Sequence, residues 1–451
     1  MEWKIYPGMS SRQKINRFIF LAGFLSILNG AVAQEVYNLS RVIETGLERN
    51  FALQVVRNNE ELAINNYTVG NAGMLPTVTA TNRFGGTLNS TAQNYADGSS
   101  NTSDNIHNTS GSAAIGLGMT IFRGFQVRNT YEKLGVQAEL QGLKTQMEIE
   151  NLVARIVSEY NYYLEQINLY QNLAYAVALS RERVRIDEER YLLGSASKMQ
   201  LLQSIVYLNA DSSRFASQNE VLRSSQIRLN ELMASDNPGE DIIPMDSLIR
   251  INQDLVYDSL LSQTLRYNTS LQIASKNRMI SELDYKIIQS ASYPFLTMSS
   301  GYGYNYSGYG SGTLSNQHVY GLNYGLTLGM DLFDGFNRKR EKSNARIDIE
   351  NKIIQYREVE QAVRADLLTI YYAYENNLNL MRLEEQNLAV ARENLEIAIE
   401  RYKLGSLAGL ELREVQKSLL DAEERLISVK YQAKLAEISL LQISGSIMDY
   451  L

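Results

Sequence analysis

The chain repeats itself, and this internal duplication limits the folds open to it more than any other feature of the sequence. Three short motifs of the first half recur in the second half, each 211 positions later. The matching pairs are 117–119 with 328–330, 123–125 with 334–336, and 190–195 with 401–406. A long period of this kind indicates that each half forms one supersecondary unit and that the two units fold alike.

A second set of matches, 218 positions apart, extends the duplication upstream. Residues 50–53 resemble 268–271, and Pro76 corresponds to Pro294. A difference of seven residues between Pro76 and Leu117 reconciles the two offsets. Between the halves lies a stretch that contains Pro238, Gly239 and Pro244. The sequence therefore predicts a first repeat at 34–234, a linker or equatorial segment at 235–259, and a second repeat at 260–451.

Residues 1–33 have the pattern of a secretory signal peptide. Basic residues precede an apolar stretch at 18–28, and Ala31-Val32-Ala33 supplies the small side chains that signal peptidase recognises. The alternative, a permanent membrane anchor, is less well supported because the apolar stretch is too short to span a bilayer comfortably. We expect an exported chain that begins at Gln34.

Composition excludes several classes of function. The 451 residues include no cysteine and two histidines, and the net charge is -7. Disulfides, cysteine metal sites and lipid attachment at an N-terminal cysteine are excluded, and a multi-histidine metal centre is nearly so. The negative charge argues against nucleic acid as a partner.

Each half contains a stretch in which side chains alternate between two kinds. In 113–121 and 320–332, apolar residues alternate with small or polar ones, as in a strand with one apolar face. Further strands are expected at 77–84 and 295–306. Each half therefore contains one hairpin, and the expected hairpins are 77–122 and 295–333, with polar loops at 85–111 and 307–318.

Long helices surround these hairpins. We expect a first helix over 41–72, ended before Pro76. After the strands, Phe-x-Gly-Phe predicts a strand-to-helix turn, because glycine permits backbone changes that a side chain obstructs. The turn residues are Gly124, Phe125, Gly335 and Phe336. The following helix runs for about 65 residues, or roughly 100 Å.

That helix carries a seam of apolar residues with alternating steps of three and four, which is typical of a coiled coil. The seam consists of Val153, Ile156, Tyr160, Tyr163, Ile167, Tyr170, Ala174, Val177, Val184 and Tyr191. Glycines at 194 and 405 then suit the left-handed residue that ends a helix. The expected helical hairpins are 126–234 and 337–443, with their turns at Gly194, Ser195, Gly405 and Ser406.

Four strands with one apolar face match part of a membrane β-barrel. A soluble β-sandwich has the same alternation, but it needs more strands and must bury the Tyr, Leu and Met face. Four strands cannot close, and unpaired backbone groups in lipid are costly. Two copies give eight strands, which side chains fill, whereas three give twelve strands and an open lumen. We therefore predict an α+β membrane protein, a trimer with a 12-stranded membrane barrel and a tunnel of long antiparallel coiled-coil helices.

The mature chain resembles the TolC-like outer-membrane efflux proteins, also called outer membrane factors. The resemblance rests on the duplication, on the proline at each hairpin entrance, on the Phe-Arg-Gly-Phe and Phe-Asp-Gly-Phe turns, and on Arg-Tyr-x-x-Gly-Ser at 190–195 and 401–406. It implies a homotrimer with a 12-stranded outer-membrane barrel in lipid and a periplasmic tunnel of helices. It also implies docking, at the helix turns, to a periplasmic adaptor and an inner-membrane pump. The pump supplies the energy, and the duct itself is passive.

The same resemblance implies a closed entrance at the second helix turn. In the family, a tyrosine before the glycine, an arginine after it and two aspartates further on form the constriction. Tyr402 matches the tyrosine, Leu407 replaces the arginine, and Glu411 and Glu414 take the acidic positions. At the repeat offset, these two glutamates correspond to Gln200 and Gln203. We expect Glu411 and Glu414 to gather six carboxylates around a threefold axis, where they would attract cations; the alternative is ordinary solvated helix residues.

Catalysis is not expected. His107 and His318 fall in the predicted outer loops, and carboxylates such as those at 187–189 are typical of solvated helix faces. We predict no enzyme activity, cofactor or metal. The leading function is an efflux duct for small molecules. A type I duct for secreted polypeptides and a coiled-coil adhesin or envelope spacer are the alternatives.

Overall fold

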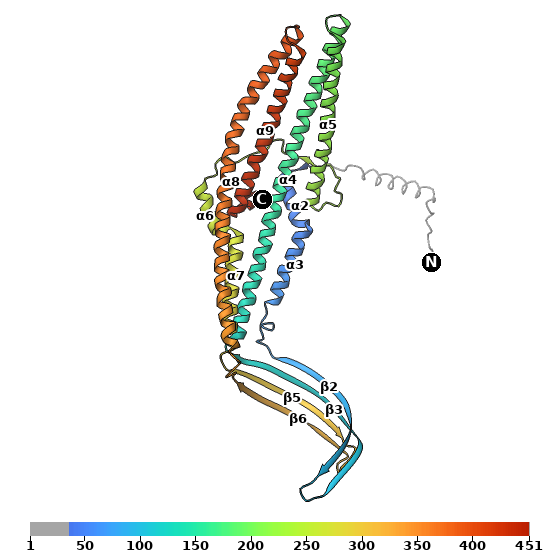
Figure 1. Cartoon of the computed structure of the whole chain (residues 1–451), viewed down its shortest axis with the longest axis vertical. Coiled ribbons are helices and arrows are strands. Elements are labelled where there is room, and N and C mark those ends of the chain that lie inside the picture. Colours follow the sequence, from blue (N-terminus) through green and yellow to red (C-terminus); the bar gives the residue numbers. More distant parts are fainter. Residues whose placement is uncertain (1–35, 451) are drawn as a thin grey trace, which may run out of the picture.

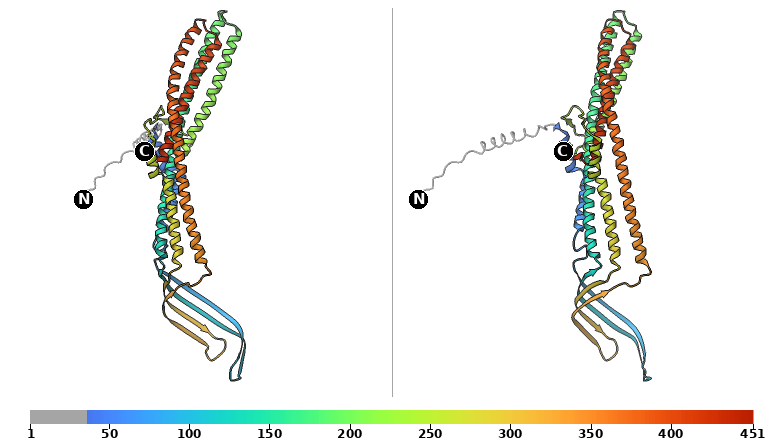
Figure 2. Two further views of the ribbon diagram at one scale, coloured as in Figure 1. Left: turned by 60° about the vertical axis from the view of Figure 1, so that its left-hand side comes forward. Right: turned by 90° about the vertical axis from the view of Figure 1, so that its left-hand side faces the viewer.

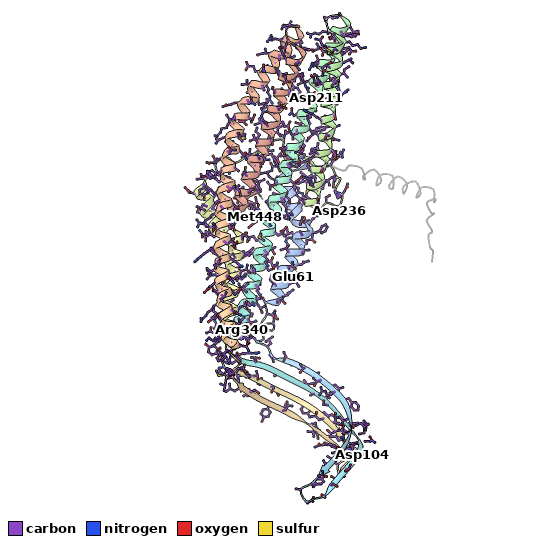
Figure 3. The ribbon with its side chains drawn as sticks, in the orientation of Figure 1. Glu61, Asp104, Asp211, Asp236, Arg340 and Met448 are labelled. Carbon is purple, nitrogen blue, oxygen red and sulfur yellow. The ribbon has the colours of Figure 1, made fainter. Side chains whose placement is uncertain are left out.

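The computed structural model describes residues 36–450. The predicted signal peptide and the start at Gln34 lie outside these residues. The molecule is elongated, with a bundle of long helices at one end and a single sheet at the other (Figure 1). Both views in Figure 2 show the sheet leaving the bundle at an incline to the helix axes. Arg340 lies at the end of the bundle beside the sheet, and Asp211 lies in the opposite half of the bundle (Figure 3).

The two halves contain the same series of two helices, two long strands and two long helices in the same order, which confirms the duplicated α+β fold. The first half consists of β1 (Val36–Tyr37), α2 (Leu39–Arg49), α3 (Phe51–Asn66), β2 (Thr77–Asn94), β3 (Ser100–Arg123), α4 (Gln126–Leu192) and α5 (Lys198–Leu232). After β4 (Ile243–Pro244), the second half consists of α6 (Tyr257–Tyr267), α7 (Thr269–Ser290), β5 (Phe295–Gly308), β6 (Asn316–Gly329), α8 (Asn337–Lys403), α9 (Gly409–Ser444) and the short 3-10 helix η1 (Ile447–Tyr450).

The single helix expected over 41–72 is wrong, because the chain breaks at Asn50. The Asn50 side chain caps α3 by accepting from Leu53 N, and it donates to Leu232 O at the end of α5. In the second half, Asn268 accepts from Leu271 N and donates to Ile443 O at the end of α9. An asparagine at a helix N-cap stabilises a new helix start. Asn50 thereby places α3 beyond the end of α5, and Asn268 places α7 beyond the end of α9.

The four long strands form one antiparallel sheet in the order β2-β3-β5-β6. The loop expected over 85–111 is wrong, since β2 and β3 pair until Asn94 faces Ser100. The second turn is also shorter than expected, because Gly308 pairs with Asn316. Apolar alternation ends in these segments, but backbone pairing with the neighbouring strand does not require it. His107 and His318 consequently lie in β3 and β6 rather than in loops.

The long helices pack as coiled coils. Helices α4 and α8 each have 67 residues, close to the expected length. Within α8 a series of buried residues falls every seven positions, which is the spacing of a coiled-coil seam. Its members are Leu367, Tyr374, Met381, Leu388, Leu395 and Tyr402. Leu412, Leu419, Leu426, Ala433 and Leu440 follow the same spacing in α9. Helices α4 and α9 lie between α5 and α8 in the bundle (Figure 1).

The predicted seam of α4 holds only in its lower part. Val153, Ile156, Tyr160 and Tyr163 are buried, as expected. Between Tyr163 and the C-terminal end of α4, a second series of residues, most of them polar, is buried instead, and Tyr191 of the predicted seam is exposed. That series is Asn172, Ala176, Ser180, Arg183 and Asp187. The apolar periodicity failed here because paired polar side chains occupy the buried face.

The linker packs around the middle of the bundle. Tyr160 of α4 donates to Asp246, and Tyr163 donates to Ile242 O. On the other side, Tyr374 of α8 donates to Asn252 O, and Glu437 of α9 accepts from Asn252 N. These contacts tie the segment between the repeats to both helical hairpins. No helix among residues 36–450 is long and apolar enough to cross a membrane.

Candidate channel wall and entrance

The sheet has one apolar face and one polar face. The register aligns Ala80, Ile115, Tyr302 and Leu322 in one row across the four strands. A polar row contains Thr79, Gly116, Gly301 and Asn323. The side chains of Ile115, Tyr302 and Leu322 are 60%, 57% and 66% exposed in the single chain. This apolar face has no protein to cover it, as expected for a surface that contacts lipid.

The strand-to-helix turns are built as predicted from the Phe-x-Gly-Phe motif. Gly124 and Phe125 both have left-handed backbone conformations, with φ of 56° and 67°. Gly335 and Phe336 repeat this geometry, with φ of 69° and 65°. The two phenylalanines of each motif meet edge to face, with ring centroids 5.3 Å apart. The sequence did not indicate that the phenylalanine also adopts a left-handed conformation.

At the other end of the molecule, the helix turns are also alike in the two halves. Gly194 and Gly405 have φ of 73° and 78°, as expected for residues that end a helix. Ser195 N donates to Arg190 O, and Ser406 N donates to Arg401 O. The serine hydroxyls donate to the same carbonyl oxygens. The four predicted turn residues therefore shape the turns, and all four are exposed at the tips.

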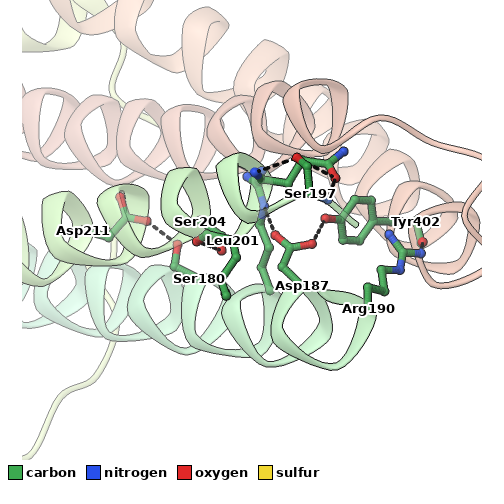
Figure 4. Close-up of polar contacts among 10 residues, drawn as sticks. Ser180, Asp187, Arg190, Ser197, Leu201, Ser204, Asp211 and Tyr402 are labelled. Atoms are coloured by element: carbon green, nitrogen blue, oxygen red, sulfur yellow. Dashed lines mark hydrogen bonds and ion pairs between the residues drawn. The ribbon is translucent and has the colours of Figure 1, made fainter. Parts of the chain in front are cut away.

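Helix α4 joins α8 near these turns through a buried polar network (Figure 4). Tyr402 is 4% exposed, and its hydroxyl donates to Asp187 of α4. Arg190 donates to the backbone carbonyl of Tyr402, and its guanidinium lies 4.6 Å from the centre of the Tyr402 ring. Burial raises the pKa of Tyr402, and the hydrogen bond to Asp187 adds to this effect. Tyr402 therefore stays a neutral donor.

Asp187 also faces Arg183 of the same helix. The Arg183 Nε to Asp187 Oδ2 distance is 3.7 Å, and the two side chains are 5% and 2% exposed. Arg183 Nε and Asp187 Oδ2 have no hydrogen-bond partner among the described residues. The pair is thus held by charge attraction rather than by a close hydrogen bond. Gly409 of α9 lies against it, and an added Cβ there would come 2.9 Å from Arg183 Nη2.

A second polar contact joins α5 to α9. Arg413 donates to both carboxylate oxygens of Asp211, at 2.7 and 2.8 Å, and Ser180 donates to the same carboxylate. Burial opposes ionisation of Asp211, but these hydrogen bonds outweigh it and lower the pKa of Asp211. The Tyr207 ring contacts the guanidinium groups of both Arg183 and Arg413, at 5.1 and 5.0 Å. Buried polar contacts thus hold the two helical hairpins together.

The other predicted entrance residues lie apart from this network. Leu407 is half-buried and packs on the apolar cluster that contains Tyr402 and Leu412. Glu411 and Glu414 lie on the first turns of α9, and neither is buried. Gln200, the counterpart of Glu411, completes a capping box with Ser197 at the start of α5. The two halves therefore differ in capping as well as in charge, since the N-cap of α9 is Ala408.

Sequence reasoning missed the residues that make the network. Asp187 was expected on a solvated face, and that interpretation is wrong for Asp187, although Glu188 and Glu189 are exposed. Arg183 and Arg413 carried no signal, because each lies among other charged residues on a long helix. Asp211 carried none because it belongs to none of the repeated motifs. Arg190 could have been found, since it belongs to the repeated Arg-Tyr-x-x-Gly-Ser motif. Residues 36–450 contain no group of His, Asp and Glu side chains able to hold a metal ion.

Comparisons with known proteins agree with this architecture. The family model for "Outer membrane efflux protein" matches residues 42–235 and 260–446, one segment in each half. The outer membrane protein TolC of Vibrio cholerae is 21% identical over 439 residues, which cover 96% of this chain and 95% of TolC.

Solved structures share the fold. The Campylobacter jejuni CmeC outer membrane channel matches with a TM-score of 0.75 and 15% identity, covering 90% of this chain and 85% of CmeC. The open state of the Neisseria gonorrhoeae MtrE outer membrane channel matches with a TM-score of 0.68 and 17% identity, covering 91% and 89%. The family model spans most of the chain, in both halves. This chain therefore belongs to the outer membrane efflux protein family, and it is an outer-membrane channel that extends into the periplasm.

Proposed function

We propose that three copies of this chain form a passive duct that carries small molecules from a periplasmic adaptor and an inner-membrane pump to the cell exterior. The observation that carries the proposal is the sheet, whose apolar face is uncovered and whose edge strands β2 and β6 each have one unpaired side. In lipid, unpaired backbone groups cost several kcal/mol each, about the strength of a hydrogen bond in an apolar medium. Pairing β2 with β6 of a neighbouring copy removes every free edge.

The helices support the same assembly. The edge helix α8 carries a second, exposed stripe of apolar residues two positions after its buried seam. Its members are spaced by seven residues and are Leu383, Val390, Ile397 and, as the C-cap that follows the helix, Leu404. The opposite edge helix, α5, exposes Met199, Leu202 and Val206. Because the two edges differ, contact between them is head-to-tail and closes into a ring. Three copies give twelve strands, enough for an open lumen.

The entrance is proposed at the helix turns, which lie opposite the sheet (Figure 1). There the Tyr402 to Asp187 and Arg413 to Asp211 contacts hold the second helical hairpin against the first. Opening the entrance requires α8 and α9 to separate from α4 and α5. The network therefore acts as the latch, in place of an arginine at Leu407. Exposed Leu192, Leu193 and Leu404 at the tips offer apolar contact to the adaptor.

Native mass spectrometry of the detergent-purified protein tests the assembly. A trimer is expected as the main species, because edge strands and edge helices both need a neighbour. The variant Leu322→Pro, with the change in β6, should no longer form a trimer under the same conditions, since proline removes a backbone donor of the edge strand. As a matched control, Leu322→Val keeps that donor and should remain trimeric. A monodisperse monomer of the parent with native strand content would refute the shared barrel.

A further inference from the structure

One charged side chain, Arg83 of β2, occurs in the part of the sheet where all four strands lie side by side. The strands contribute residues 77–86, 109–118, 299–308 and 316–325 to this region, and the remaining residues there are apolar, small, polar and neutral, or histidine. A lone charge in such a setting is expensive unless water reaches it. The face of the sheet on which Arg83 lies therefore indicates which side of the sheet is in contact with water.

The register puts Arg83 on the polar face. It pairs with Ser112, which pairs with Asn305. Its neighbours along the strand on that face are Thr81 and Gly85. Arg83 is exposed, and it forms no hydrogen bond or ion pair within residues 36–450. On the apolar face a cation would be strongly unfavourable in lipid, so the polar face is the side that water fills.

Arg83 lies near the middle of the membrane band. It is six residues after Thr77, the first residue of β2, which is about 20 Å along a strand. With a strand tilt of about 40°, this becomes roughly 15 Å along the barrel axis, within an apolar band about 25 Å tall. The guanidinium is thus far from both mouths of the barrel.

Nothing on the second half balances this charge. At the repeat offset of 218, Arg83 corresponds to Gly301. A Cβ at Gly301 would come 3.0 Å from Asn323 Oδ1 and 3.0 Å from Ile115 O, so a side chain there meets close neighbours. At the strand exits, by contrast, Asp334 of the second half is paired with Arg338, with Nε and Oδ2 3.0 Å apart. The positive charge at Arg83 occurs once per chain.

We propose that Arg83 forms a ring of three positive charges in the lumen of the barrel and selects for solutes that carry carboxylate, phosphate or sulfonate groups. This inference rests on the trimeric barrel proposed above. Low-dielectric walls focus the field of charges that line a narrow aqueous path, and a ring of fixed charges attracts counter-ions. This ring lies in the barrel, at the opposite end of the molecule from the carboxylates expected at the entrance (Figure 1). It therefore concentrates anionic solutes and opposes cationic ones at the level of the barrel, whereas the entrance carboxylates act on cations at the helix turns.

The absence of native cysteine permits a direct test of the local potential. A single cysteine is placed at Ser112, next to Arg83, in the full-length protein reconstituted in vesicles. The rate of modification by an anionic methanethiosulfonate, the sulfonatoethyl reagent, is divided by the rate for the cationic trimethylammonioethyl reagent. Changing Arg83→Gln should lower this ratio about fivefold, because a charge within a few ångströms is only partly screened by salt. Arg83→Lys keeps the charge and should preserve the ratio.

Two controls separate this inference from the proposed function. Thr327 lies on the same face of the sheet as Arg83, near the end of β6 that leads to the helices. It is separated from Arg83 by well over a Debye length of about 8 Å, so Arg83→Gln should leave the ratio of modification rates at Thr327→Cys unchanged. Ile115→Cys lies on the apolar face and should react slowly with both reagents. Equal ratios at Ser112→Cys with and without the Arg83→Gln change would overturn the inference alone. Fast, equal modification of Ile115→Cys and Ser112→Cys would overturn the barrel, and the inference with it.

Discussion

Single polar residues decide how the two helical hairpins meet. Tyr402 was expected at the entrance from the sequence, and the structure places it in a buried contact with Asp187. The partner could not be predicted, because Asp187 is one of three consecutive acidic residues and only its position on the α4 surface distinguishes it. Leu407 shows the reverse case. The sequence revealed a missing arginine, and the structure shows an apolar contact there.

The carboxylates that we expect to line the entrance give the first test at this scale. We expect Glu411→Gln combined with Glu414→Gln to lower cation selectivity and to weaken block by multivalent cations from the periplasmic side, because six carboxylates would be removed from the axis. Single-channel recording measures both. Gln203→Ala in the first half is the matched control. Gln200 is unsuitable for this purpose, since its loss removes the side-chain oxygen that accepts from Ser197 N in the capping box of α5. Unchanged selectivity and block would remove these glutamates from the entrance.

Glu165 of α4 makes stability depend on pH. It is 6% exposed, and burial raises its pKa to about 7, with only a hydrogen bond from Gln166 opposing the shift. Because the folded protein binds this proton more tightly than the unfolded chain, stability falls as pH rises from 4.5 to about 7 and stays low above that. Glu165→Gln should stabilise the protein at pH 8 by about 1 to 3 kcal/mol and should flatten this pH dependence.

Thermal unfolding at pH 5 and pH 8 provides the measurement for Glu165. The exposed Glu188 serves as the control, and Glu188→Gln should leave both midpoints nearly unchanged. If the thermal midpoint changes by the same amount between pH 5 and pH 8 in the parent and in the Glu165→Gln variant, the Glu165 carboxyl titrates normally.

Elements were predicted well where periodicity and turn chemistry agreed. The long helices, the helix reversals at Gly194 and Gly405, and the two Phe-x-Gly-Phe turns could be inferred from sequence, because glycine and proline mark their ends. The strand lengths could not, since residues 85–111 lack apolar alternation and gain their strand structure from pairing. The break at Asn50 was missed because asparagine is common within helices, and its capping role depends on the distant Leu232 carbonyl.

The two strand exits offer a matched pair of glycines. Both have left-handed backbones, which cost a substituted residue about 1 to 2 kcal/mol. An added Cβ at Gly124 would also come 2.3 Å from Ser290 O, whereas at Gly335 the nearest atom is Asn337 Nδ2 at 3.9 Å. We therefore expect Gly124→Ala to reduce trimer yield and lower the thermal midpoint much more than Gly335→Ala. Equal losses would mean that backbone conformation alone decides.

At the scale of the whole molecule, the duplication explains the arrangement. Two equivalent units place both hairpins at one end and both helix turns at the other (Figure 1), so each of three chains would supply a third of the barrel wall and a third of the proposed entrance. The sequence predicted this arrangement because both repeats carry the same order of motifs. It could not supply the register, which aligns Ala80, Ile115, Tyr302 and Leu322 in one apolar row. The hairpin turns, being farthest from the helices, are expected to face the cell exterior.

Single-channel recording of the purified protein in a planar lipid bilayer tests the central claim most directly. If three chains form one duct, discrete and uniform current steps should appear, and their size should respond to multivalent cations added on the periplasmic side only. The decisive variant carries Tyr402→Phe together with Arg413→Gln, which remove the proposed entrance contacts. If this variant inserts into the bilayer as a trimer and yet carries no current, the claim that the chain forms a channel is contradicted.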